Sequence, residues 1–123
     1  MKNNPVGWFE IYVQDMERAR KFYEAVFEVK LEKLINIGIE LWLFPKSMNE
    51  HGSPGALVKI EGFPSGNNSV LIYFTCKDCA IEAKRVVENG GTVFKEKFAI
   101  GEYGFISLVS DSEGNMIGLH SQK

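Results

Sequence analysis

The sequence predicts an α+β fold in which one strand–helix–three-strand unit (βαβββ) occurs twice. The sequence contains two amphipathic helical patterns. Each is preceded by a strand rich in β-forming residues and by an aspartate at the helix N-cap position, and each is followed by three short strands. A cluster of Gly, Pro, Ser and Asn at residues 62–68 separates the two units. We therefore expect one domain over residues 1–123, with half-modules 6–62 and 69–121 and a linker at about 62–68.

The first strand is expected at residues 8–13, where β-branched and aromatic residues are concentrated. Alternate side chains of a strand point to opposite faces. One face then carries Phe9, Ile11 and Val13, and the other carries Trp8, Glu10 and Tyr12.

The first helix is expected after Asp15, a favourable N-cap residue. Apolar residues follow at the i, i+3, i+4, i+7 spacing of one helical face. They are Ala19, Phe22, Tyr23 and Val26. The other strands of this unit are predicted at residues 30–35, 39–44 and 56–60, with a polar loop at 46–54.

The second unit repeats this order with a strand at residues 70–76 and an N-cap at Asp78. The helical face predicted after it comprises Ala83, Val86, Val87 and Gly90, and the Gly90-Gly91 pair is typical of a helix end. The remaining strands are predicted at 92–97, 105–109 and 116–120, with a loop at 98–104 and a turn at 111–115.

Composition excludes several classes of protein. The 14 basic and 16 acidic residues give a net charge of −2 with no basic run, so we expect no nucleic-acid partner. No apolar run approaches the roughly 20 residues of a membrane span, and the first residues contain no apolar signal region. We therefore expect a cytoplasmic protein without a membrane partner. The two histidines, His51 and His120, are too few for an imidazole-rich zinc site.

Two motifs resemble a known family. The segment 9–19 followed by Phe22-Tyr23, and the closing segment 111–117, are similar to the opening and end motifs of the glyoxalase/bleomycin-resistance/extradiol-dioxygenase (vicinal oxygen chelate) superfamily. The end motif departs from the family pattern at Ser112, where proline is usual. The resemblance implies two βαβββ modules that form a curved mixed sheet around a cleft, and it implies a homodimer.

The resemblance also implies where a metal would be held in the metal-dependent relatives. Those ligand positions fall on Trp8, Lys59, Leu71 and Gly118 in this sequence. Trp, Leu and Gly offer no side-chain ligand and Lys is a poor one. We expect no metal and no other cofactor. A rearranged divalent site that uses Glu10, His120 and a further carboxylate is the alternative.

Glu10 is the most informative candidate, because a carboxylate in an apolar, aromatic strand must be paired or solvated. It is the candidate catalytic base, or an anchor for a cationic or hydroxyl-bearing ligand, with Lys59 expected nearby. The alternative is that Glu10 forms a structural salt bridge or sits on an exposed edge. An aromatic cleft that binds a small molecule is expected from further side chains. The full set of expected ligand-binding residues is Trp8, Glu10, Tyr12, Trp42, Lys59, Tyr73, Tyr103, Phe105 and His120.

Two other features have weaker implications. The loop at 98–104 contains two glycines around Tyr103 and could cover the cleft, although an ordinary strand connection explains it as well. Cys76 and Cys79 have the C-x-x-C spacing, but no second pair accompanies them, so neither zinc nor redox chemistry is favoured.

The leading hypothesis is a metal-free, glyoxalase-like protein that binds a small, partly apolar molecule for sequestration or sensing. The alternative is a lyase or isomerase of the same superfamily that uses Glu10 as base or a rearranged metal site. A third reading is an interaction module whose cleft is filled by its own side chains.

Overall fold

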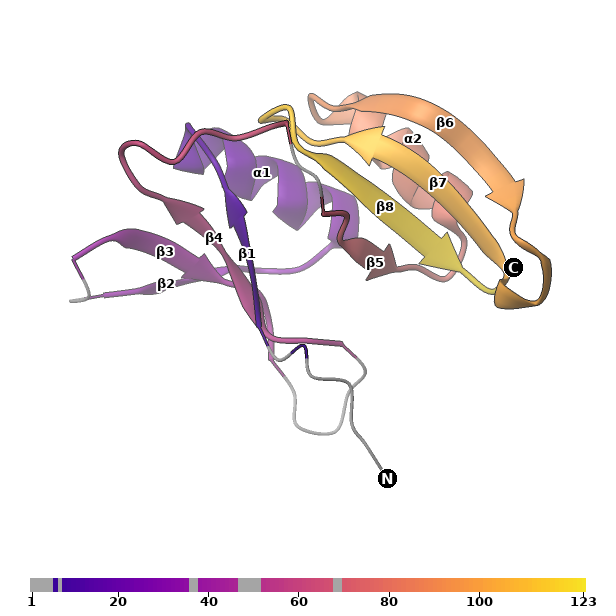
Figure 1. The fold of residues 1–123 in the computed structure, drawn as a ribbon, viewed down its shortest axis with the longest axis horizontal. Helices are drawn as coiled ribbons and strands as arrows, with labels where there is room; N and C mark the ends of the chain where they lie inside the picture. Colours follow the sequence, from indigo (N-terminus) through magenta and orange to yellow (C-terminus); the bar gives the residue numbers. More distant parts are fainter. Residues whose placement is uncertain (1–5, 7, 36–37, 47–51, 68–69) are drawn as a thin grey trace.

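The computed structural model describes residues 6, 8–35, 38–46, 52–67 and 70–123, and these form two units of the same element order (Figure 1). The first comprises β1 (Phe9–Tyr12), α1 (Met16–Phe27), β2 (Glu32–Leu34), β3 (Glu40–Leu43) and β4 (Gly55–Lys59). The second comprises β5 (Tyr73–Thr75), α2 (Cys79–Glu88), β6 (Thr92–Ala99), β7 (Phe105–Ser110) and β8 (Met116–Ser121). A 3₁₀ turn, Gly101–Tyr103, lies within the predicted 98–104 loop. The predicted α+β class with two βαβββ units is confirmed.

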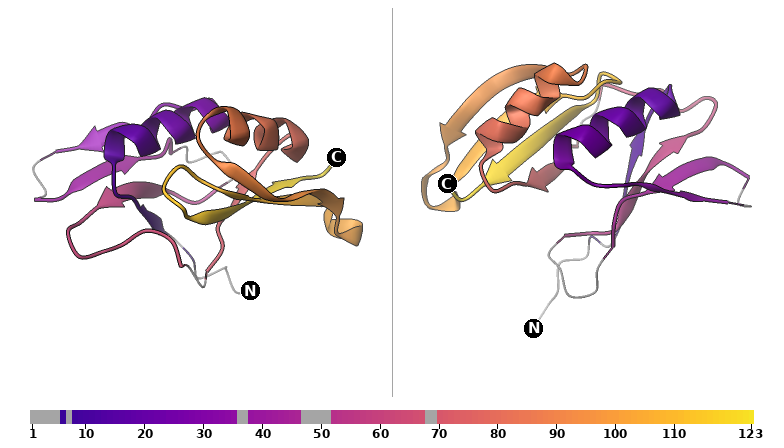
Figure 2. Two further views of the ribbon diagram at one scale, coloured as in Figure 1. Left: turned by 90° about the horizontal axis from the view of Figure 1, so that it is seen from above. Right: turned by 180° about the vertical axis from the view of Figure 1, so that it is seen from behind.

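Each unit forms its own four-stranded mixed sheet. The strand orders are β1-β4-β3-β2 and β5-β8-β7-β6, and the pairs β1–β4 and β5–β8 are parallel. Both helices lie on the same side of the two sheets, so the opposite side, called the open face below, has no helical cover (Figure 2). β1 and β5 are the edge strands that lie nearest the middle of the molecule (Figure 1).

The helices begin where their caps predict. The Asp15 carboxylate accepts a hydrogen bond from the Arg18 N–H at 3.1 Å, and the Asp78 carboxylate accepts one from the Ala80 N–H at 3.0 Å. The predicted face of α1 is buried, but Val87 of α2 is 59% exposed. The buried face of α2 is therefore narrower than predicted and consists of Cys79, Ala83 and Val86.

The turn predicted at residues 111–115 lies in the second unit and forms hydrogen bonds to the first. The Glu113 carboxylate accepts hydrogen bonds from the backbone N–H groups of Gln14 and Asp15, both at 2.9 Å, and from Arg18 Nε at 2.6 Å. Burial alone would raise the pKa of Glu113, but these donors lower it from 4.5 to about 2. Glu113 thus fixes the β1–α1 junction of the first unit to the last turn of the second.

A second set of bonds reinforces this junction. Tyr23 of α1 donates to Asp111, and Asn115 Nδ2 donates to the Tyr12 carbonyl at 2.9 Å. Gly66 of the linker donates its N–H to Asn115 Oδ1 at 2.6 Å. The end motif therefore holds the two units together through hydrogen bonds.

The main core lies between the helices and the sheets and extends across both units. Its centre is aromatic: Phe74 of β5 stacks on Phe27 of α1 with ring centroids 4.3 Å apart, and Phe74 also meets Phe9 of β1 edge-on at 6.4 Å. Aromatic rings bury large apolar areas, so this cluster stabilises the packing of one unit on the other.

Candidate functional site

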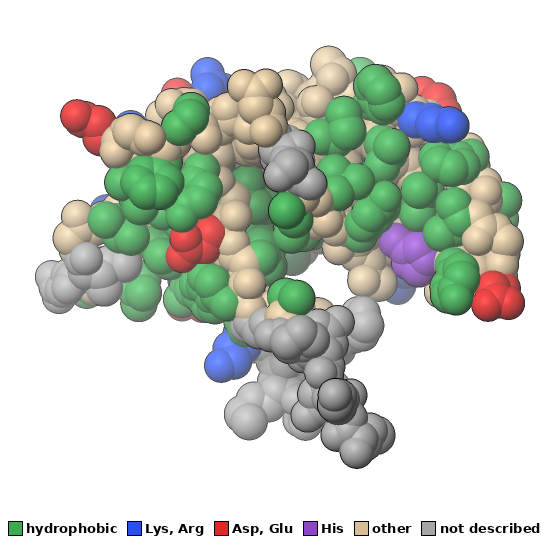
Figure 3. Space-filling view, viewed as in Figure 1, with side chains coloured by type: hydrophobic (Ala, Val, Ile, Leu, Met, Phe, Trp, Pro, Cys, Tyr) green, Lys and Arg blue, Asp and Glu red, His purple; other side chains and the backbone are tan. Residues whose placement is uncertain are grey.

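Strand alternation on β1 directs three polar or amphipathic side chains to the open face. Ile11 and Val13 are buried under α1, so Trp8, Glu10 and Tyr12 point away from the helices. Trp8 is 44% exposed. The space-filling view shows that apolar side chains cover much of the open face and that charged groups are sparse on it (Figure 3). The facing predicted for the first strand is confirmed.

Glu10 is held by its two neighbours on this strand and not by Lys59. Trp8 Nε1 donates a hydrogen bond to Glu10 Oε2 at 3.1 Å, and the Tyr12 hydroxyl donates to Oε1 at 2.7 Å. The hydrogen bond to Glu10 raises the pKa of Tyr12, with smaller contributions from burial and from the Glu10 charge. The Glu10 carboxylate is thus oriented by two neutral donors.

The second unit presents a matching position on the open face. Tyr73 of β5 pairs in register with Gly118 of β8, and the Tyr73 ring lies across that glycine. A Cβ atom built on Gly118 would lie within 2.2 Å of the Tyr73 ring, so only glycine permits this placement. Tyr73 stays 46% exposed and forms a flat aromatic surface.

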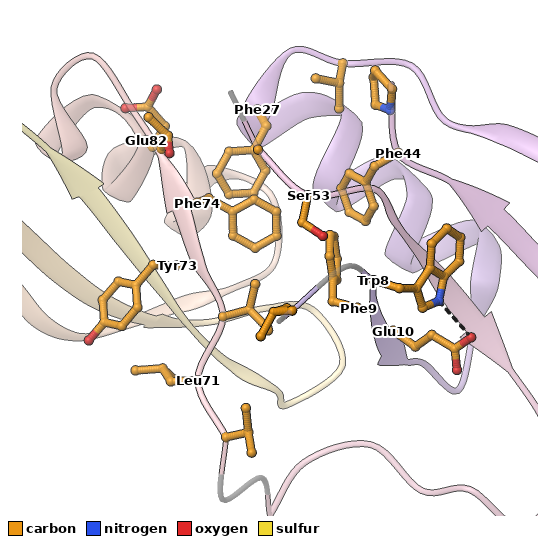
Figure 4. A pocket seen from close by; sticks show the side chains of 17 residues that line it. Trp8, Phe9, Glu10, Phe27, Phe44, Ser53, Leu71, Tyr73, Phe74 and Glu82 are labelled. Atoms are coloured by element: carbon orange, nitrogen blue, oxygen red, sulfur yellow. Dashed lines mark hydrogen bonds between the residues drawn. The ribbon is translucent and has the colours of Figure 1, made fainter. Parts of the chain in front are cut away.

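A cavity of about 920 Å³ lies between the edges of β1 and β5 (Figure 4). Its lining combines side chains of both units, Trp8, Phe9 and Glu10 from the first and Leu71, Tyr73 and Phe74 from the second. Phe9 and Phe74 lie in the middle, with Trp8 and Glu10 to one side and Tyr73 to the other (Figure 4). Phe27 and Phe44 close its inner side. A second cavity of about 140 Å³ is lined by Glu10, Tyr12 and the linker residues Pro64 and Gly66. Glu10 therefore lies where the two cavities adjoin.

Three expected cleft residues lie on the other side of the sheets, which corrects the prediction. Trp42 pairs with buried Leu57 and packs beneath the Arg20 guanidinium, 3.9 Å from the ring centroid. Lys59 is two residues beyond Leu57 on the same strand face and pairs with Glu40. Phe105 pairs with Ser121 and packs against the main core.

The error at Lys59 has a simple cause. Gly118 pairs with Tyr73 and Ala56 pairs with Glu10, so Ala56 is the counterpart of Gly118 in the first unit. The prediction assumed that Lys59 follows Gly55 by the same number of residues by which Gly118 follows Gly114. This assumption shifted the register by three residues, and any odd shift moves a side chain to the opposite face.

Tyr103 and His120 lie apart from both cavities. Tyr103 is on the exposed 3₁₀ turn, and its carbonyl oxygen is 2.6 Å from His120 Nε2. His120 shares the face of Tyr73, since Thr75 pairs with His120 two residues after the Tyr73–Gly118 pair. The structure therefore brings Trp8, Glu10 and Tyr73 to the larger cavity and leaves Tyr103 and His120 outside it.

The residues at the family's ligand positions do not fit a divalent ion. Trp8, Leu71, Gly118 and Ala56 offer no carboxylate, imidazole or thiolate. Among the residues that the structure describes, no three His, Cys, Asp or Glu side chains gather in a group that could hold a metal. His51 lies outside the described residues, as does part of the 46–54 loop.

The two cysteines are packed in the core near the base of α2. Burial raises the pKa of the Cys76 thiol to about 12, and Cys79 is fully buried. A thiol with so high a pKa is a poor nucleophile and a poor metal ligand at neutral pH.

The inner wall of the larger cavity was not predicted from the sequence. Phe9, Phe27, Phe44 and Phe74 pack against the core and also line the cavity. The position of one unit against the other determines this, and no local pattern of the sequence encodes that position. The aromatic content of 12% was the available signal.

Two comparisons with known proteins, one with family models and one with solved structures, agree on the fold. A family model described as the Glyoxalase/Bleomycin resistance protein/Dioxygenase superfamily matches residues 6–119. No curated protein matches the chain by sequence.

Several solved structures superpose over nearly the whole chain. A hypothetical protein from S. aureus is 17% identical, with a TM-score of 0.75 and coverage of 98% of this chain and 95% of that one. The antibiotic binding protein TnmS3 from Streptomyces sp. CB03234 is 23% identical, with a TM-score of 0.70 and coverage of 100% and 99%. A glyoxalase/bleomycin resistance protein/dioxygenase family enzyme from Burkholderia phytofirmans PsJN is 15% identical, with a TM-score of 0.74 and coverage of 95% and 98%. At these identities the likeness shows a shared fold.

Proposed function

The chain belongs to the Glyoxalase/Bleomycin resistance protein/Dioxygenase superfamily, and within it we propose a protein that binds a small, partly apolar molecule between its two units. Sequestration or sensing of that molecule is the role we infer. The observation that carries the proposal is the cavity of about 920 Å³ with aromatic walls from both units and a carboxylate at its edge. Cavities of about 300–1,000 Å³ with apolar walls and few polar groups are typical of small-molecule sites.

Similarity to an antibiotic binding protein supports the proposal at the level of the fold. Within the described residues none of the helices is long and apolar enough to cross a membrane. The alternative, an isomerase or lyase that uses Glu10 as base or a rearranged divalent metal site, stays a prediction.

We also propose that the protein is a homodimer whose second copy covers part of the open face. Several large apolar side chains of the first sheet and its flanks are solvent-exposed, a pattern that marks an interaction surface. Among them are Trp8, Leu34, Ile39 and Phe63. Sedimentation at two protein concentrations measures the oligomeric state, and a monomer at both would reject the dimer without affecting the cavity.

Titration with the neutral apolar dye Nile red tests ligand binding. A ligand of about 20 heavy atoms that gains about 0.3 kcal/mol per atom binds with a Kd of tens of micromolar, which sets the concentration range. Leu71→Asp places a charge on the cavity wall and is expected to weaken binding by about tenfold or more.

Ile81→Asp is the matched control, because Ile81 is half-exposed on the outer surface of α2. This variant introduces the same side chain outside the cavity and is expected to bind the dye like the wild type. Equal binding by both variants would show that the dye binds elsewhere and would reject the site.

A further inference from the structure

The charged side chains of the larger cavity are acidic. Two carboxylates line it, Glu10 near the open face and Glu82 on α2, and among the described residues no Lys, Arg or His lines it. Glu82 is partly buried, and its Oε2 is 3.9 Å from Arg85 Nη1. The cavity therefore combines apolar walls with negative charge.

Glu10 is oriented by two neutral hydrogen-bond donors, Trp8 Nε1 and the Tyr12 hydroxyl. No Lys, Arg or His nitrogen of the described chain lies within 4.0 Å of it, since the ion pairs of that part involve other carboxylates. A carboxylate has about four acceptor positions, so further donors can bind.

Among the described residues, three cations of the first unit that are near Glu10 in sequence or sheet register are directed elsewhere. Arg18 pairs with Glu113. Lys59 lies on the helix-covered side of β4, and the Arg20 guanidinium stacks on Trp42 on that same side. None of these three cations pairs with Glu10.

We propose that the cavity selects ligands that carry a protonated amine on an apolar body, with the ammonium group bound to Glu10. This inference rests on the proposed function, because it names the ligand class of the same site. The Trp8 and Tyr12 rings flank the carboxylate, and Phe63 stacks on Tyr12 with centroids 5.1 Å apart. These rings provide an apolar boundary for the carbon atoms beside the ammonium nitrogen and favour a cation at their faces.

Three probes of one shape and different charge test this selectivity. They are 1-naphthylmethylamine, a cation near pH 7, the neutral 1-naphthalenemethanol, and the anionic 1-naphthoic acid. At low salt, where screening is weak, we expect the amine to bind about tenfold or more tighter than the alcohol, because a charge-assisted hydrogen bond is worth roughly 1.5–3 kcal/mol. The acid is expected to bind most weakly.

Glu10→Gln keeps the shape and removes the charge. In this variant the amine-to-alcohol preference should fall to about twofold or less, while the alcohol binds as in the wild type. Glu88→Gln is the matched control: Glu88 is exposed at the end of α2, and the change in net charge is the same. It should keep the full preference for the amine.

Each other result has a distinct meaning. Equal binding of amine and alcohol by the wild type would overturn the cation inference and leave the proposed function standing. An equal loss of both probes in Glu10→Gln would overturn it too, since Glu10 would then only position Trp8 and Tyr12. Absence of binding for all three probes would reject the proposed function, and this inference with it.

Discussion

The Tyr23 hydroxyl donates a 2.6 Å hydrogen bond to Asp111 Oδ2, across 88 positions of sequence and from one βαβββ unit to the other. Tyr23 is fully buried, and Asp111 is 3% exposed. Burial raises the pKa of Asp111, and the hydrogen bonds from Tyr23 and Asn115 counter this effect. The bond anchors the turn before β8 to α1, so the position of β8 relative to β1 depends on it.

Tyr23→Phe removes one hydroxyl and leaves a buried carboxylate oxygen without that donor. We expect the free energy of unfolding to fall by about 1–3 kcal/mol, measured by urea denaturation. Tyr103→Phe serves as control, because Tyr103 is 67% exposed. If Tyr23→Phe unfolds at the wild-type urea concentration, the bond does not hold the units together.

The stability contributed by Glu113 is expected to depend on pH. Its pKa in the folded state is about 2, below the ordinary 4.5, so its contribution is fully present above about pH 4.5 and is lost as the pH falls toward 2. The difference in unfolding free energy between wild type and Glu113→Gln should shrink over this range. Asp111 has the opposite effect. Because its pKa is raised in the folded state, its contribution to the free energy of unfolding falls as the pH rises.

The comparison with Glu113→Gln isolates the Glu113 contribution, since Asp111 is present in both proteins. Urea denaturation at a series of pH values between about 2 and 7 measures it. A difference that stays constant over the whole series would contradict the assigned role of Glu113.

Gly118 and Tyr73 are expected to be energetically coupled. Gly118→Ala places a methyl group where the Tyr73 ring lies and should cost about 1 kcal/mol or more, at the low end of overpacking because the half-exposed ring can move. In a Tyr73→Ala background the same change should cost less. A double-mutant cycle by urea denaturation measures the difference, and strict additivity would show that the ring does not depend on Gly118.

The cysteines should be unreactive in the folded protein. The pKa of Cys76 is about 12 and Cys79 is fully buried, so little thiolate is present or accessible near pH 8. A colorimetric disulfide reagent should modify both thiols rapidly in denaturant and slowly without it. Rapid modification of the native protein would revive a redox role for the C-x-x-C pair.

The sequence was sufficient for the fold because the local signals agree with the tertiary structure. The N-caps Asp15 and Asp78, the buried face of α1 and the alternation on β1 each appear where they were predicted. The site was only partly predictable. Strand alternation grouped Glu10 with Trp8 and Tyr12 on one face of β1, as in the structure, but on β4 a register error assigned Lys59 to the wrong side of the sheet. The cavity itself depends on how two separate sheets pack, which has no local signature.

The two tryptophans allow the most direct test of ligand binding between the units. Trp8 lines the cavity and Trp42 packs under Arg20 on the opposite side of the sheet. Trp42→Phe leaves Trp8 as the only tryptophan, and Trp8→Phe leaves Trp42. The measurement is tryptophan emission during titration with 1-naphthylmethylamine. We predict a saturable change in the emission of Trp8 and none in that of Trp42; a change confined to Trp42, or no change in either protein, would contradict binding at this cavity.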